Sequence, residues 1–220
     1  MSDKIKHYAT LLAALYGAIA RVSGAKVIIE TSKDPTFACL LTRIPGSDVR
    51  VVHLVRDSRA VAYSWTRRRR MPSPIGEQEF MPQASPTETA IKWSAWNVGC
   101  YVLKVARFSY QRLTYESFVA DPRAMLDKLS AFVDEVTISS DSRLRDKEVK
   151  LSDHHIFSGN PMRATTGWLP VRLDTEWQTQ LSTSQFAKVT AITWPLLRLN
   201  GYATVPALRK SEGTVVSSGS

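Results

Sequence analysis

The sequence predicts an α/β domain with a mainly parallel sheet, and two observations support this prediction. Short runs typical of strands occur at residues 26–30, 49–55 and 110–114, and segments with helical spacing of apolar residues separate them. Strands that alternate with helices indicate a parallel sheet, because each parallel strand needs a crossover connection. The run at 49–55 is nearly all apolar, which suits a strand buried on both faces.

The first third of the chain predicts a helix, a strand and a second, shorter helix. Seven apolar side chains share one helical face, and Gly24 is suited to end that helix. They are Tyr8, Leu11, Leu12, Leu15, Tyr16, Ile19 and Val22. Residues 26–30 predict the first strand, and residues 37–43 predict a short helix that ends before Pro45 and Gly46.

Capping residues mark the next two helices. The strand at 49–55 is followed by Arg56, and Asp57 or Ser58 is suited to cap a helix that begins near residue 59. Ser85 and Glu88 form a capping-box pattern with Pro86 at the first helical position. This pattern predicts a helix from residue 86 to about residue 107.

The second half of the chain predicts one strand and several helices. Residues 110–114 indicate the third strand, and Asp121 introduces a helix over 122–133. Residues 138–152 form a charged connector, and helices cover 175–199 with a kink near Pro195. We expect residues 1–205 to form a single domain and residues 206–220 to be a polar, disordered tail.

The composition excludes several classes of protein. The chain carries 29 Lys and Arg against 20 Asp and Glu, a net charge of +9. This charge indicates an anionic partner, such as nucleic acid, a membrane surface or a phosphorylated small molecule, or else a solvated basic surface, and the charge alone does not separate the two. No apolar run reaches the about 18 residues of a membrane span. Cys39 and Cys100 lack the spacing of metal ligands or of a disulfide framework. We therefore expect a cytoplasmic protein without a metal.

The end of the second strand is the most informative position for function. Ligands of parallel sheets bind at the carboxyl ends of the strands, and the following helix start offers free N–H groups suited to a phosphate. Ser64 lies seven positions beyond Asp57 and shares its helix face, so Arg56 and Ser64 are placed to hold one anion. The alternative for Arg56 is a surface ion pair, which is the commoner role of an arginine after a strand.

Four segments in order resemble the sulfotransferase family, which uses 3′-phosphoadenosine 5′-phosphosulfate (PAPS) as sulfuryl donor. They are residues 29–35, 51–64, 113–122 and 155–163. The resemblance implies a P-loop-type three-layer sandwich. It implies that Arg56 and Ser64 contact the 3′-phosphate of the donor and that Tyr115 lies beside the adenine. It also implies a second contact to this phosphate from Arg163 and the Gly159-Asn160 backbone.

One element of the family pattern has no counterpart in this sequence. Relatives begin with a strand and a glycine-rich loop that holds the 5′-phosphosulfate, whereas Gly17 and Gly24 lie in a helical pattern and at its end. We therefore expect an N-terminally truncated domain with weakened donor binding. The alternative function is that of an inactive sulfotransferase remnant or a nucleotide-binding regulator.

Sulfuryl transfer needs a cation near the leaving group and a base near the acceptor. Lys33 is the candidate cation, with an ordinary surface lysine as the alternative. Glu30 is the candidate base, and its alternative, which we favour, is a structural carboxylate that pairs with Lys33 or caps a loop. We expect a small-molecule acceptor with a hydroxyl or amine and a homo-oligomer. The run Arg67–Arg70 is too short to predict nucleic-acid binding, and a solvated helix end explains it better.

Overall fold

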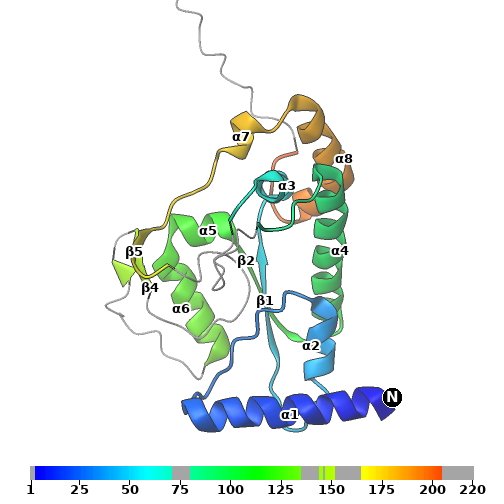
Figure 1. Cartoon of the computed structure of the whole chain (residues 1–220), viewed down its shortest axis with the longest axis vertical. Helices are drawn as coiled ribbons and strands as arrows, with labels where there is room; N and C mark the ends of the chain where they lie inside the picture. Colours follow the sequence, from blue (N-terminus) through cyan, green and yellow to red (C-terminus); the bar gives the residue numbers. More distant parts are fainter. Residues whose placement is uncertain (1–2, 71–79, 135–143, 146, 152–164, 205–220) are drawn as a thin grey trace, which may run out of the picture.

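The structure, a computed structural model, describes residues 3–70, 80–134, 144–145, 147–151 and 165–204. It is a mixed α/β structure (Figure 1). One sheet pairs β1 (Arg50–Val55) with β2 (Ser109–Thr114), and a second contains β3 (Leu144–Arg145), β4 (Glu148–Leu151) and β5 (Gly167–Pro170). The helices are α1 (Asp3–Ser23), α2 (Pro35–Leu41), α3 (Ser58–Thr66), α4 (Pro86–Val105), α5 (Tyr115–Ala120), α6 (Pro122–Val133), α7 (Trp177–Gln180) and α8 (Thr183–Leu199).

The pair β1 and β2 is parallel and confirms two of the three predicted strands. The register sets Val55 opposite Thr114, so both strands end at the same edge. On one face of β1, His53 and Val55 are buried, and Val55 packs with Trp93 of α4 and Leu197 of α8. On the opposite face, Leu54 is 59% exposed. The expectation that this strand is buried on both faces is therefore wrong for the described residues.

The predicted strand at 26–30 is wrong. Residues 24–34 contain neither helix nor strand, and the side chain of Ile29 is 83% exposed. A β-branched run becomes a strand only beside a partner, and β1 pairs with β2 alone among the described strands. Instead, the carboxylate of Glu30 accepts hydrogen bonds from Tyr16 and from the backbone N–H of Ser32, which hold the segment as a loop.

The sheet content also differs from the expected mainly parallel arrangement. Of the five strands described, three form an antiparallel sheet, and β3 and β4 lie within the segment predicted as a connector. Here Arg145 lies over the ring of Trp168, with 4.1 Å from Cζ to the ring centre, and also pairs with Glu148. These contacts across strands stabilise a hairpin whose sequence has weak periodicity.

The helix starts agree closely with the capping residues. Asp57, Ser85 and Asp121 each accept a hydrogen bond from a backbone N–H in the first turn of α3, α4 and α6 respectively. The C-terminal helices α7 and α8 lie in the predicted region, with Pro195 inside α8. The short helix α5 directly after β2 was not predicted.

Helix α1 confirms the predicted N-terminal helix, but most of its apolar face is not packed. Leu12 is buried, whereas five other members of this face are exposed, namely Tyr8, Leu11, Leu15, Ile19 and Val22. Figure 1 shows α1 across the end of the molecule opposite α3, far from the carboxyl ends of β1 and β2. No helix among the described residues is long and apolar enough to cross a membrane.

Candidate functional site

Two strand-to-helix junctions meet at the carboxyl edge of the parallel sheet. Because Val55 pairs with Thr114, the next residues, Arg56 and Tyr115, are brought side by side. The guanidinium carbon of Arg56 lies 4.6 Å from the centre of the Tyr115 ring, in cation–π contact. Two of the residues predicted to bind the donor are therefore adjacent, although 59 positions separate them in the sequence.

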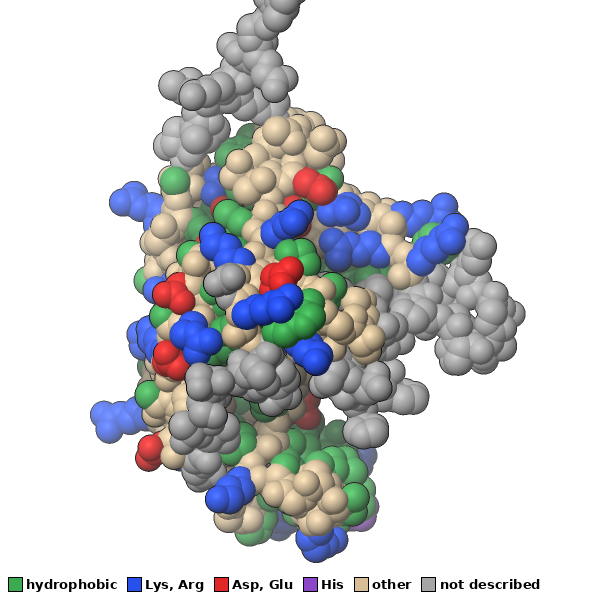
Figure 2. Space-filling model, turned by 90° about the vertical axis from the view of Figure 1, so that its left-hand side faces the viewer, with side chains coloured by type: hydrophobic (Ala, Val, Ile, Leu, Met, Phe, Trp, Pro, Cys, Tyr) green, Lys and Arg blue, Asp and Glu red, His purple; other side chains and the backbone are tan. Residues whose placement is uncertain are grey.

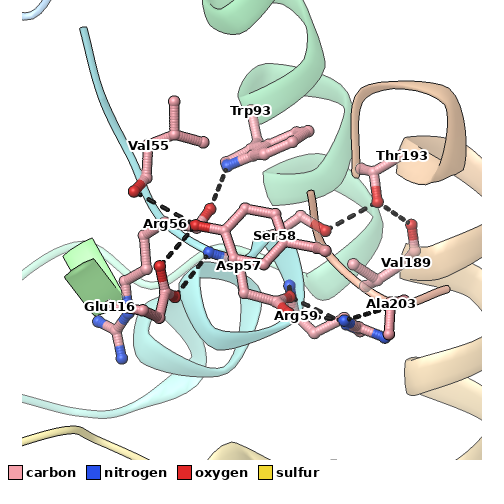
Figure 3. Close-up of polar contacts among 11 residues, drawn as sticks. Val55, Arg56, Asp57, Ser58, Arg59, Trp93, Glu116, Val189, Thr193 and Ala203 are labelled. Carbon is pink, nitrogen blue, oxygen red and sulfur yellow. Dashed lines mark hydrogen bonds and ion pairs between the residues drawn. The ribbon is translucent and has the colours of Figure 1, made fainter. Parts of the chain in front are cut away.

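The backbone of Arg56 is fixed while its side chain leaves the core. Trp93 Nε1 donates a hydrogen bond of 3.0 Å to the carbonyl oxygen of Arg56. Figure 3 shows the Arg56 side chain extending away from α4 and α8, whereas Ser58 and Arg59 point toward α8. The Ser58 hydroxyl lies 2.7 Å from the Thr193 hydroxyl, which itself donates to the carbonyl of Val189. These buried contacts hold the start of α3 against α8.

A buried ion pair forms the base of this junction. Asp57 accepts hydrogen bonds from Arg59 Nε and Nη2 at 2.9 and 2.6 Å, and both side chains are less than a tenth exposed. Arg59 also donates to the carbonyl of Ala203, and the rings of Trp177 and Phe186 lie within 5.1 Å of its guanidinium carbon. With these contacts made, Arg59 has a structural role.

Glu116 links the two junctions. Its carboxylate accepts a hydrogen bond from the backbone N–H of Asp57 at 3.3 Å and from the Tyr202 hydroxyl at 2.6 Å. Burial raises the pKa of Tyr202 well above its usual range, and the adjacent Glu116 carboxylate raises it further. Tyr202 therefore stays protonated and serves as a donor.

Among the described residues, the guanidinium of Arg56 has one ion-pair partner and, at Nε, a buried donor without a partner. Its Nη2 lies 2.9 Å from Oδ2 of Asp174, and the two side chains are 21% and 25% exposed. Its Nε is buried and has no hydrogen-bond partner in the part of the chain that the structure describes. Burial acts to raise the pKa of Asp174, but the hydrogen bond and charge of Arg56 outweigh it and lower that pKa. Arg56 therefore forms the ion pair that the sequence analysis gave as its alternative role. Its Nε remains available to donate a hydrogen bond to a ligand.

Ser64 does not contact Arg56 in the described part of the chain. It lies near the end of α3, and its hydroxyl accepts a hydrogen bond of 3.3 Å from Arg69. Arg67 forms an ion pair with Glu176 at 2.9 Å, and Arg68 lies over the ring of Phe80. Figure 2 shows Lys and Arg side chains gathered on the upper half of one face, together with a few acidic groups.

The two residues predicted to be catalytic lie on the loop between α1 and α2. Glu30 is engaged with Tyr16 and Ser32, which matches its structural alternative as a loop cap. Lys33 is exposed, has a positive φ of 65° and forms no side-chain hydrogen bond or ion pair among the described residues. Pro35, which directly follows this loop, packs on Gly99 of α4. Gly99 lies six positions along α4 from Trp93, which contacts Arg56, so about 9 Å of helix separates the two contact points. The structure does not bring Lys33 or Glu30 into contact with Arg56.

Three predicted donor-binding residues, Gly159, Asn160 and Arg163, lie outside the described residues. Conversely, Asp174 and Glu176 contact the site and were not predicted. The sequence offered only a weak signal for Asp174, because an aspartate shortly before a helix is usually a cap. Within the described residues, no three His, Cys, Asp or Glu side chains form a group that could hold a metal ion.

Comparisons with known proteins give no match for this chain among family models, curated proteins or solved structures.

Proposed function

We propose that this protein binds the 3′-phosphoadenosine end of PAPS at Arg56 and Tyr115 and transfers the sulfuryl group of PAPS to a small-molecule hydroxyl or amine. The observation that carries this proposal is the Arg56 guanidinium at the carboxyl edge of β1 and β2. It lies over the Tyr115 ring and has a buried, unpaired Nε donor. A buried donor without a partner is costly, and a phosphate oxygen supplies the missing acceptor.

The described residues fit one end of the donor. Arg56 offers a charged donor for the 3′-phosphate, and Tyr115 offers an aromatic ring near the adenine. The other residues proposed to contact the 3′-phosphate are Ser64, Gly159, Asn160 and Arg163. The net charge of +9 favours a ligand with several negative charges.

PAPS supplies an activated sulfuryl group when it is bound. The acceptor oxygen or nitrogen then forms a bond to sulfur while the bond from sulfur to the 5′-phosphate oxygen breaks. Lys33 is proposed to stabilise the charge on that leaving oxygen, and Glu30 to take the acceptor proton. This role suits Lys33 because its side chain is exposed and forms no hydrogen bond or ion pair among the described residues.

A second candidate function is nucleotide binding without transfer. The observation that favours it is the engagement of Glu30 with Tyr16 and Ser32, in a loop that does not contact Arg56. In this case the protein retains the 3′-phosphate half of the site and acts as a regulator or as an inactive relative of the transferases.

Calorimetric titration with 3′-phosphoadenosine 5′-phosphate (PAP), the desulfated product, tests the binding site. We expect PAP to bind, and Arg56→Ala to weaken binding at least about tenfold, because a charge-assisted hydrogen bond contributes about 1.5–3 kcal/mol. Arg21→Ala, which removes an exposed arginine from α1, is the matched control and should leave binding unchanged. Equal PAP affinities in the wild type and Arg56→Ala would exclude the site.

A turnover assay separates the two candidate functions. PAP release from PAPS is measured with phenols, alcohols and amines as acceptors, for the wild type and for Lys33→Ala. If PAP release depends on the acceptor and is abolished in Lys33→Ala, the result supports the transferase function. PAP binding with no release supports the nucleotide-binding alternative.

A further inference from the structure

The segment between β5 and α7, residues 171–176, lies over the candidate site. Figure 1 shows it as the yellow coil that leaves β5, passes beside α5 and reaches α7 above α3. It contains neither helix nor strand, and it carries the two carboxylates Asp174 and Glu176. We call it the acidic segment.

The acidic segment is held mainly by groups of the candidate site. Asp174 pairs with Arg56 at 2.9 Å, and the Tyr115 hydroxyl donates a hydrogen bond of 3.1 Å to the carbonyl of Arg172. Arg56 and Tyr115 are the two residues to which we assign the donor. Both are therefore engaged by the same short segment, which approaches them from 118 and 57 positions away in the sequence.

The second carboxylate of the acidic segment neutralises a further arginine. Glu176 accepts from Arg67 at 2.9 Å and from the Tyr63 hydroxyl at 3.4 Å. The side chains of Arg67 and Glu176 are 39% and 58% exposed, so solvent weakens this pair, and such pairs are easily broken. The side chains of the acidic segment are thus held by one partly buried ion pair and one exposed ion pair. Its backbone accepts the hydrogen bond from Tyr115, and Val171 at its start donates one to the carbonyl of Lys147.

A carboxylate and a phosphate compete for the same guanidinium donors. Each offers oxygen acceptors that fit the fork of an arginine, but a phosphate monoester carries up to two charges and a carboxylate carries one. The ion pair to Asp174 occupies Nη2 of Arg56 and leaves Nε unpaired, whereas a phosphate has enough oxygens to accept from both. Exchange of Asp174 for a dianionic phosphate is therefore favourable on Arg56, and exchange for a monoanion is less so.

We propose that Asp174 is an internal competitor for the phosphate position on Arg56 and sets the affinity of the site. The acidic segment leaves Arg56 when a phosphate monoester binds, so every ligand of this position must first break the ion pair. This inference rests on the proposed function, because it takes the Arg56 position as the phosphate site.

Titration of Asp174→Asn with PAP tests the proposal. Removal of the competing charge should tighten PAP binding about tenfold, the scale of one charge-assisted interaction. Adenosine 3′-sulfate 5′-phosphate, which carries one charge at the 3′ position, should gain by the same factor, because every ligand of Arg56 must break the same ion pair. Asp127→Asn, an exposed carboxylate on α6, makes the same change in net charge and should leave both affinities unchanged.

A double variant connects the effect to Arg56. The gain in PAP affinity from Asp174→Asn should disappear in the Arg56→Ala background, because Asp174 then has no Arg56 guanidinium for which to compete. Asp174→Ser serves as a second variant, and thermal unfolding of each protein confirms that it is folded. If the wild type binds PAP and both Asp174→Asn and Asp174→Ser bind it equally well or more weakly, the role of Asp174 is overturned. The proposed function then still stands. No PAP binding by any folded variant overturns both.

Discussion

At the scale of single residues, His53 shows how one buried side chain couples β1 to α4. Asn97 donates through Nδ2 to the carbonyl of Trp93, so its Oδ1 faces His53 Nε2 at 2.9 Å. Nε2 therefore carries the proton, and Nδ1 accepts from the Tyr110 hydroxyl. His53 is only 6% exposed, which places it in the core on the buried face of β1.

This arrangement predicts a loss of stability in mild acid. Burial lowers the pKa of His53 below 6.5, and the charge of Arg112 lowers it further, although the hydrogen bond to Asn97 acts in the opposite direction. As the pH falls through 6.5, the unfolded chain gains a proton at this histidine that the folded chain does not gain. The contribution of neutral His53 to the free energy of unfolding should therefore be fully present above pH 6.5 and decrease as the pH falls below 6.5.

Urea denaturation at a series of pH values measures this effect. His53→Gln should be less stable at pH 7.5 but should show a smaller loss on acidification. His7→Gln, which changes an exposed histidine on α1, provides the comparison and should keep the wild-type pH dependence. An unchanged slope in His53→Gln would assign the acid sensitivity to other groups.

At the scale of elements, α2 and α4 approach each other closely at a glycine. A Cβ built on Gly99 would lie 2.9 Å from Cγ of Pro35 and 3.0 Å from its Cβ, and the proline ring cannot rotate away. Gly99→Ala therefore gains helix propensity but forces α2 off α4. We expect a net destabilisation of about 1–3 kcal/mol, the typical cost of overpacking.

A Gly→Ala substitution in α1 should change the free energy of unfolding in the opposite direction. At Gly17 in α1, a Cβ would meet only the flexible end of the Arg21 side chain, at 3.4 Å. Gly17→Ala should therefore stabilise the protein by about 0.5–1 kcal/mol through helix propensity. Chemical denaturation of the two variants checks both values. A stable Gly99→Ala protein would show that α2 does not pack on α4 as described.

At the scale of the whole molecule, α1 presents an uncharged apolar stripe on a basic protein. Residues 8–20 of α1 contain no charged side chain, although the chain has a net charge of +9. Figure 2 shows most basic side chains of one face in the upper half, and apolar side chains together with a few basic ones at the lower end, where Figure 1 places α1. The middle of α1 is uncharged, which limits like-charge repulsion there, and its exposed apolar stripe favours association.

We therefore expect the protein to self-associate through α1, in line with the sequence-based expectation of a homo-oligomer, which stays a prediction. Sedimentation velocity should show a concentration-dependent species larger than 24.6 kDa. Leu11→Glu together with Leu15→Glu should shift this species to the monomer, because both side chains are exposed and the charge disfavours contact. A wild-type protein that stays monomeric at all concentrations would contradict the role of α1. Ile91→Glu and Val102→Glu, exposed apolar positions on α4, are the control.

The sequence alone determined most of the helices and the position of Arg56. Asp57, Ser85 and Asp121 cap their helices through backbone groups two or three positions away, so local pattern was sufficient to find them. Arg56 and Tyr115 directly follow β1 and β2, and parallel pairing of those strands brings them together. These features depend on neighbours in sequence or on one strand pair.

Only the tertiary structure decided which apolar segments found partners and which charges met. Residues 26–30 have a strand-like composition but no strand beside them, and the apolar face of α1 has helical spacing but little to pack against. The pair of Arg56 and Asp174 joins residues 118 positions apart. Composition and periodicity describe what a segment is able to bury or to bind, whereas its partner is chosen by the path of the whole chain.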